Sequence, residues 1–183
     1  MTDRVIDTNV ACVADGLHVQ ATPACVDACR EVLARMVKDG GLVLDDLDLI
    51  VEEYVGRLGH AGNPGIGRAF VKWAHDRRFD IACCRRVRLT RRSSDWRLFE
   101  EFPDHPGLAG FDADDQKFAS VARVSRAPVT NAVDSDWWNY RVALNSSGIQ
   151  IEFVCPEAAG PLNGGASTRV PSAGAGPDRR RPS

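Results

Sequence analysis

The sequence predicts an α/β fold with a small parallel sheet and helices on both of its faces. Three observations predict it. Short apolar runs of strand length alternate with longer segments in which apolar residues recur at helical spacing. Residues that begin or end helices, such as Thr22, Pro23 and Gly40, stand between them. The alternation continues from residue 4 to residue 154, and strands that alternate with helices form parallel sheets.

The first half of the chain predicts two strands and three helices. Thr22 and Pro23 have the residue types of an N-cap and a first helical position, and the helix they begin stops at Gly40-Gly41. Asp45 is expected to cap the next helix, and Asn63-Pro64 to open the third. The expected elements are a strand at 4–7, a helix at 23–38, a strand at 42–44, and helices at 45–58 and 63–78.

The second half of the chain continues the alternation after a weaker stretch. Two prolines and two glycines between residues 103 and 110 predict a loop. The expected elements are a weak strand at 87–89, a short helix at 95–102, a helix at 112–124, a strand at 128–131, a helix at 136–144 and a strand at 149–154.

Composition predicts one domain, residues 1–156, followed by a disordered tail, residues 157–183, rich in Gly, Pro, Ser and Arg. The net charge is −2 for the whole chain. The tail holds four arginines against Glu157 and Asp178, so the remaining body carries −4. This balance argues against broad electrostatic binding of nucleic acid but leaves room for a local basic patch.

The N-terminus has no secretory signal pattern, and no apolar run approaches the roughly 20 residues that span a bilayer. We therefore expect a soluble, cytoplasmic protein with no membrane partner. In that compartment cysteines stay reduced, so we expect all six to be thiols, mostly in the core. Cys25 and Cys29 share a helix face, but no second Cys or His pair with zinc-ligand spacing accompanies them.

Four acidic signals fall where an α/β fold brings side chains to one edge of the sheet. Asp7 ends the first strand and Asp134 follows a late strand, and ligands bind at the carboxyl ends of parallel strands. Glu53 and Asp115 are expected on helices that reach the same edge. Carboxylates that crowd together repel unless protons or cations relieve them, and oxygen ligands favour Mg²⁺ or Mn²⁺.

These motifs resemble those of the PIN-domain family, small metal-dependent nucleases that include toxins of toxin–antitoxin pairs. The resemblance covers roughly residues 3–154. The matching residues are Val5-Ile6-Asp7-Thr8-Asn9, Glu53, Asp115 with Phe118-Ala119, and Asp134 with Asp136.

The resemblance implies a three-layer α/β/α sandwich and Mg²⁺- or Mn²⁺-dependent hydrolysis of nucleic acid, RNA more than DNA. It implies a metal-binding and catalytic core, an auxiliary ligand, and residues that orient water or a carboxylate. It also implies two protein partners, an antitoxin and a second copy of the chain. The metal-binding and catalytic core would be Asp7, Glu53, Asp115 and Asp134. The auxiliary ligand would be Asp136, and the residue that orients water or a carboxylate would be Thr8 or Asn9.

Several alternatives stay open at this point. Glu52 competes with Glu53, and the arginines between Arg85 and Arg92 either contact phosphates or solubilise an edge strand. Trp137 and Trp138 either stack on a base or pack in the core. A haloacid-dehalogenase-type phosphatase also begins with a strand that ends in Asp, but it needs a second Asp where Asn9 stands. A catalytically silent PIN domain acting as a binding module is the third possibility.

Overall fold

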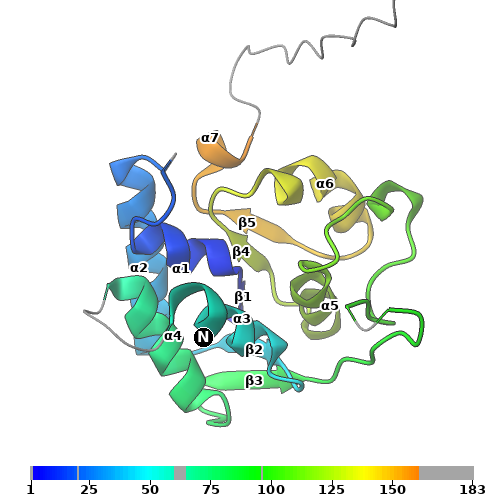
Figure 1. Cartoon of the computed structure of the whole chain (residues 1–183), viewed down its shortest axis with the longest axis horizontal. Coiled ribbons are helices and arrows are strands. Elements are labelled where there is room, and N and C mark those ends of the chain that lie inside the picture. The colour runs from blue at the N-terminus through cyan, green and yellow to red at the C-terminus, as the bar shows by residue number, and fades with distance from the viewer. Residues whose placement is uncertain (1, 20, 60–64, 96, 161–183) are drawn as a thin grey trace, which may run out of the picture.

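The computed structural model describes residues 2–19, 21–59, 65–95 and 97–160 (Figure 1). The strands are β1 (Val5–Ile6), β2 (Leu42–Asp45), β3 (Cys84–Val87), β4 (Val129–Asn131) and β5 (Ile151–Phe153). The helices are α1 (Thr8–Ala14), α2 (Pro23–Asp39), α3 (Leu49–Leu58), α4 (Ile66–Arg77), α5 (Gln116–Ser125), α6 (Ser135–Ser146) and α7 (Pro156–Ala159), with a 3₁₀ turn η1 at Pro106–Leu108.

Every strand pair is parallel, which confirms the predicted α/β class. One sheet has the order β1-β4-β5 and the other pairs β2 with β3. A parallel bridge between Arg4 and Leu42 joins β1 to β2, so the strands follow one another in the order β3-β2-β1-β4-β5. In Figure 1 the strands run through the middle of the molecule, with α1, α2 and α4 to one side and α5 and α6 to the other.

The core lies where these helices meet the strands. β1 and β2 contribute fully buried aliphatic residues, and Trp137, Tyr54 and Phe70 are the largest side chains with almost no exposure. The Tyr54 hydroxyl donates a hydrogen bond to the carbonyl of Ile6, which ties α3 to the end of β1. No described helix is both long enough and apolar enough to cross a membrane.

Helix α1 is an element that the sequence pattern did not predict. It begins directly after β1, where the Asp7 carboxylate accepts a hydrogen bond from the backbone N–H of Asn9 and so caps the helix. Four of its side chains besides Thr8 are buried against neighbouring elements, including α2 and α4. A helix of 7 residues is stabilised by such packing rather than by propensity, so it leaves little local signal.

The contact between α1 and α4 explains two glycines. Asp15, at the end of α1, accepts hydrogen bonds from the backbone N–H groups of Gly67 and Arg68 and so caps α4 from a distance. A Cβ atom on Gly67 would lie 2.1 Å from the carbonyl oxygen of Ala11, and one on Gly65 would lie 2.0 Å from a carboxylate oxygen of Asp15. The predicted start of this helix, at residues 63 and 64, lies outside the described residues.

Two predicted helix assignments differ from the structure. Asp45 ends β2 instead of beginning α3, although its carboxylate still accepts hydrogen bonds from Leu49 and Ile50. The predicted helix at 95–102 is wrong, because this segment folds back on the chain before it. Arg92 donates its backbone N–H to Leu98, and Glu100 donates its backbone N–H to Thr90.

The expectations for the tail and the cysteines also need correction. Residues 157–159, expected in the disordered tail, belong to α7, and Ala159 is buried. Cys25 and Cys155 form a disulfide with a Cα–Cα distance of 5.6 Å, so the six cysteines are not all thiols. The remaining cysteines, Cys12, Cys29, Cys83 and Cys84, are free.

Candidate metal centre

Asp7 lies at the carboxyl end of β1 with only 5% of its surface exposed. Its Oδ1 accepts the Asn9 N–H at 2.9 Å, whereas its Oδ2 is buried without any hydrogen-bond donor. Burial raises the pKa of Asp7, and the nearby Trp137 indole offsets a small part of that increase. The indole Nε1 itself makes no hydrogen bond of ordinary geometry. A buried carboxylate oxygen without a donor is costly unless a proton or a cation satisfies it.

Asp134 lies at the end of the neighbouring strand, β4. It is the N-cap of α6, where its Oδ1 accepts the backbone N–H of Asp136 at 2.8 Å. The two strand ends are held together because the Asn9 side-chain oxygen accepts the backbone N–H of Ala132 at 2.8 Å. The predicted meeting of Asp7 and Asp134 at one sheet edge therefore has a specific structural cause.

Asp115 stands at the N-cap position of α5, just before the helix and not inside it as expected. Its side chain makes no capping hydrogen bond, so its carboxylate is not used to stabilise the helix. The nearby Asp112 and Asp114 are exposed. Both residues precede α5.

Glu53 reaches the site from α3. The Thr8 hydroxyl donates to its Oε1 at 2.6 Å, and the Lys117 ammonium lies 2.5 Å from its Oε2. The neighbouring Glu52 is exposed and has no interaction with Thr8 or Lys117. The structure thus favours Glu53 over Glu52 as the residue that takes part in the site.

The electrostatics show that these carboxylates act on one another. Burial raises the pKa of Asp7 to about 7, with further increases from Asp134 and Glu53. Burial also raises the pKa of Asp115 to about 8, with Asp7 and Asp134 as the next causes. The pKa of Asp134 is raised for the same first reason. Repulsion and desolvation of this kind disfavour the charged forms, and a bound divalent cation reverses both effects.

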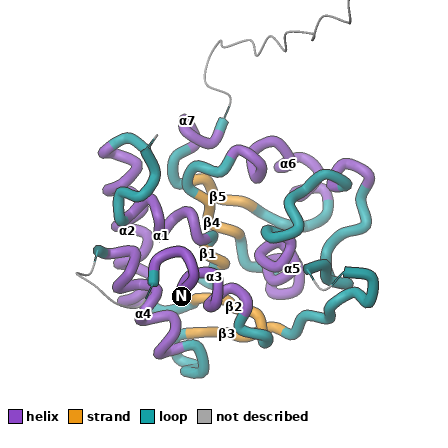
Figure 2. The backbone as a smooth tube through the Cα atoms, viewed as in Figure 1, coloured by secondary structure: helices purple, strands orange, loops and turns teal. Residues whose placement is uncertain are grey.

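An open groove of about 400 Å³ leads to these side chains. Asp115, Asp134, Glu53 and Glu52 line it together with three cationic residues, Arg57, Arg97 and Lys117, whereas Asp7 lies behind its lining. Part of its wall comes from the long connection between β3 and α5, which runs mostly as loop in Figure 2. A mixed acidic and basic groove suits a ligand that carries negative charge and arrives with a cation.

The donor set fits a hard divalent cation such as Mg²⁺ or Mn²⁺, because it offers only oxygen ligands and Asp7 Oδ2 is unsatisfied. The carboxylate oxygens of these residues lie farther apart than the ligands of a closed metal site. Within the described part of the chain, no three of these carboxylates bring oxygens within 4.8 Å of one another. Binding an ion would therefore require the side chains to move inward.

Other predicted residues take no direct part. Asp136 does not line the groove, although its backbone N–H donates a hydrogen bond to the Asp134 carboxylate. In the arginine run, Arg85 pairs with Asp3 and Arg86 with Asp48, so these two support the edge strand β3. Trp137 packs in the core, which confirms that one of the two tryptophans is buried there.

Sequence reasoning missed the cationic side of the site. Only 9% of the Lys117 surface is exposed, and its ammonium also donates a hydrogen bond to the carbonyl of Asp114. It lies two residues after Asp115, and a lysine so close to an expected ligand was the one available signal. Arg57 and Arg97 carry no local signal, because only the tertiary fold brings them to the groove.

Comparison of the chain with models of protein families, with curated proteins and with solved structures finds no match. The chemistry of this site therefore has to be inferred from its own side chains.

Proposed function

We propose that this protein is a metal-dependent nuclease of the PIN type that hydrolyses phosphodiester bonds, with RNA as the preferred substrate. The observation that supports this best is the buried, partly unsatisfied Asp7 beside Asp115 and Asp134, each with a raised pKa, at the carboxyl edge of the sheet. The parallel strands in the order β3-β2-β1-β4-β5, with helices to both sides of them, support the three-layer sandwich that this proposal includes.

In this proposal Asp7, Asp115 and Asp134 hold the ion, with Glu53 completing the set. A bound Mg²⁺ or Mn²⁺ ion supplies an activated water and neutralises charge on the phosphate. Thr8 keeps the Glu53 carboxylate oriented through its hydroxyl. Lys117 balances the Glu53 charge and also lines the groove.

Arg57 and Arg97 are the proposed contacts for the phosphates on either side of the cleaved bond. Both line the groove and both are exposed, although Arg97 is also paired with Asp95. Contacts from arginine to phosphate fix the position of a strand without reading its bases. A role as the toxin of a toxin–antitoxin pair, and pairing with an antitoxin or a second copy, belong to this proposal as well.

The phosphatase alternative is disfavoured by Asn9. A second acid at this position would have to face the reacting group, but the Asn9 side-chain oxygen is engaged by the backbone of Ala132. A silent binding domain would keep the groove and bind RNA without cutting it. The Lys117–Glu53 pair is the observation that favours this alternative, because it already neutralises one expected ligand.

The test is cleavage of labelled single-stranded RNA and single-stranded DNA by the purified full chain with Mn²⁺, Mg²⁺ or EDTA. We expect metal-dependent cleavage of RNA that falls by about 100-fold or more in Asp7→Asn and in Glu53→Gln. Asp104→Asn, which changes an exposed carboxylate outside the groove, should retain most activity. RNA binding without cleavage at any metal concentration would favour the silent domain, and turnover of a phosphate monoester alone would favour the phosphatase.

A further inference from the structure

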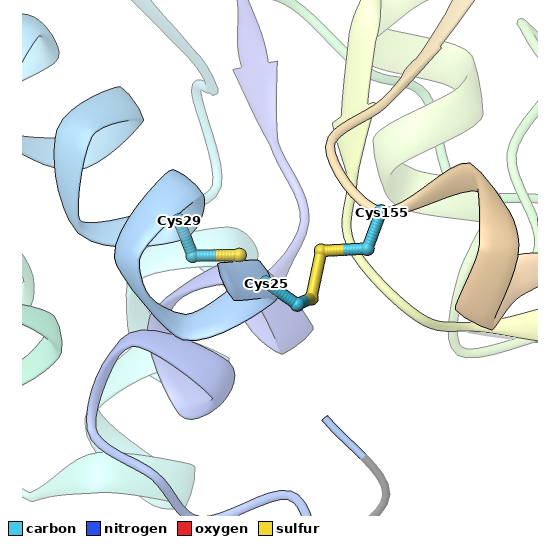
Figure 3. A group of neighbouring side chains, drawn as sticks. All are labelled: Cys25, Cys29 and Cys155. Atoms are coloured by element: carbon cyan, nitrogen blue, oxygen red, sulfur yellow. A yellow bond between two sulfur atoms is a disulfide. The ribbon is translucent and has the colours of Figure 1, made fainter. Parts of the chain in front are cut away.

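Three cysteine sulfurs lie together far from the acidic residues in sequence (Figure 3). Cys25 and Cys29 are one turn apart on α2, and Cys155 follows β5 at the start of α7. Their Sγ atoms all lie within 4.8 Å of one another, and each residue is at most 2% exposed. They are the one group of three or more potential metal ligands at this spacing within the described ranges.

In the structure two of the three sulfurs are joined, because Cys25 and Cys155 form a disulfide. A disulfide needs only two cysteines, and Cys29 stands beside it as a third, fully buried sulfur. Burial raises the pKa of Cys29 to about 12, so Cys29 remains a neutral thiol as long as no cation is present. A cation that binds thiolate changes this, because a coordinated thiol loses its proton.

We propose that the reduced form of this cluster is a binding site for one soft, thiophilic metal ion. Thiolate sulfur selects Cu⁺ and Zn²⁺ over hard cations such as Mg²⁺. Structural Zn²⁺ is almost always held by four ligands, and the group offers three. Cu⁺, which is stable with two or three thiolates, therefore fits better. The site lies at the N-terminal turns of α2, whose backbone dipole favours the negative charge of bound thiolates.

The redox chemistry of the cluster makes the disulfide and the metal mutually exclusive. A dithiol reductant supplies two electrons and two protons, the Cys25–Cys155 bond breaks and two thiols form, while the reductant becomes a disulfide. Metal binding then releases one proton from each thiol that coordinates. A disulfide oxidant takes up two electrons from the Cys25 and Cys155 thiolates, restores the bond between them and is itself reduced to two thiols, with protons taken from water. This oxidation removes two of the three ligands and expels the ion. The cluster therefore has two alternative states, one crosslinked and one metal-bound.

The test uses the full chain, reduced with a dithiol and handled without oxygen. Cu⁺ binding is measured by competition with a coloured chelator, and Zn²⁺ binding by a second such titration. We expect one ion per chain in the reduced protein and none at this site in the oxidised protein. Cys29→Ala keeps the Cys25–Cys155 pair intact and should weaken metal affinity at least about tenfold. Changing a residue that only supports a metal ligand already costs about that much affinity, and Cys29 is a ligand itself.

Cys84→Ala is the matched control, since Cys84 is also buried but lies on β3 outside the cluster. Its metal affinity should equal that of the unaltered protein, and circular dichroism checks that both variants are folded. The proposal is overturned if neither Cu⁺ nor Zn²⁺ binds to the reduced protein, or if Cys29→Ala binds as tightly as Cys84→Ala. None of these outcomes depends on nuclease activity, because the readout is metal content alone.

Discussion

Single residues at the sheet edge show both how far sequence reasoning reaches and where it stops. The position of Asp7 at the sheet edge could be predicted because it directly follows a short apolar strand, and that of Glu53 because the buried Tyr54 next to it fixes the helix face. Lys117 could not be assigned its role in the same way. Its partner Glu53 comes from another helix, and only the assembled fold brings the two within 2.5 Å.

The raised pKa values of Asp7 and Asp115 predict how stability depends on pH without metal. In the unfolded chain an Asp titrates near pH 4, whereas burial raises the pKa of Asp7 to about 7 and that of Asp115 to about 8. The folded state therefore binds more protons between these values, and its free energy of unfolding should fall as pH rises from about 4 to 8.

Urea unfolding in EDTA at a series of pH values measures this dependence. Asp115→Asn should reduce the slope, because it removes one of the two groups responsible. Asp104→Asn changes an exposed aspartate and should leave the slope as it is. Equal slopes in all three proteins would show that burial does not raise the pKa of Asp115 in solution.

The Lys117–Glu53 pair predicts a metal-dependent change in stability. Their side chains are 11% and 23% exposed, so Lys117→Met leaves a poorly solvated carboxylate without its partner. We expect a loss of about 2 kcal/mol or more in EDTA, between the values for exposed and buried pairs. The loss should shrink when Mn²⁺ is added, since the ion then neutralises Glu53. Lys72→Met, in an exposed pair with Asp76, should change little in either condition.

At the scale of elements, the longer helices and four of the five strands were predicted. The strand expected at 87–89 lies earlier, as β3 at Cys84–Val87, and the short helix α1 was not predicted. The helix expected at 23–38 is α2, because its N-cap, proline and apolar spacing all agree. Helix α1 is held by packing, and the segment expected as a helix at 95–102 instead bonds back to residues 90–92. In both cases partners distant from the segment itself decide the local structure.

Two helix glycines with different surroundings should respond in opposite ways to substitution by alanine. One lies where α1 and α4 approach closely, and the other faces open space. Gly67→Ala would place a Cβ atom 2.1 Å from the backbone oxygen of Ala11, so the helices must separate. We expect a loss of about 1–3 kcal/mol in the free energy of unfolding. Gly56→Ala, in α3 with open space around it, should stabilise the protein by up to about 1 kcal/mol. Chemical unfolding of both variants checks the pair, and a neutral Gly67→Ala would contradict the close approach.

At the scale of the whole molecule, the parallel sheet could be predicted but the crosslink could not. The alternation of strands and helices fixes the fold class, whereas cysteine pairing depends on which of six residues meet in space. Cys25 and Cys155 are 130 residues apart, and the disulfide joins α2 to the chain segment after β5. The expectation that all cysteines are thiols came from the presumed compartment and not from any local pattern.

The crosslink predicts that reduction destabilises the whole domain. Closing a loop of this length restricts the unfolded chain, so reduction should lower the free energy of unfolding by about 4–5 kcal/mol. Thiol titration of the unfolded protein should find four thiols before reduction and six after it, since four cysteines are free in the described fold. Six thiols before reduction would contradict the crosslink.

The central claim is that the carboxylates at the sheet edge hold a divalent cation, and binding of Mn²⁺ to the full chain tests it most directly. Electron paramagnetic resonance counts free and bound Mn²⁺ at pH 8 without any need for a substrate. We predict a site that is occupied in the unaltered protein, occupied in Asp104→Asn, and lost in both Asp7→Asn and Asp115→Asn. Equal Mn²⁺ binding in all four proteins, or none in the unaltered one, would contradict it.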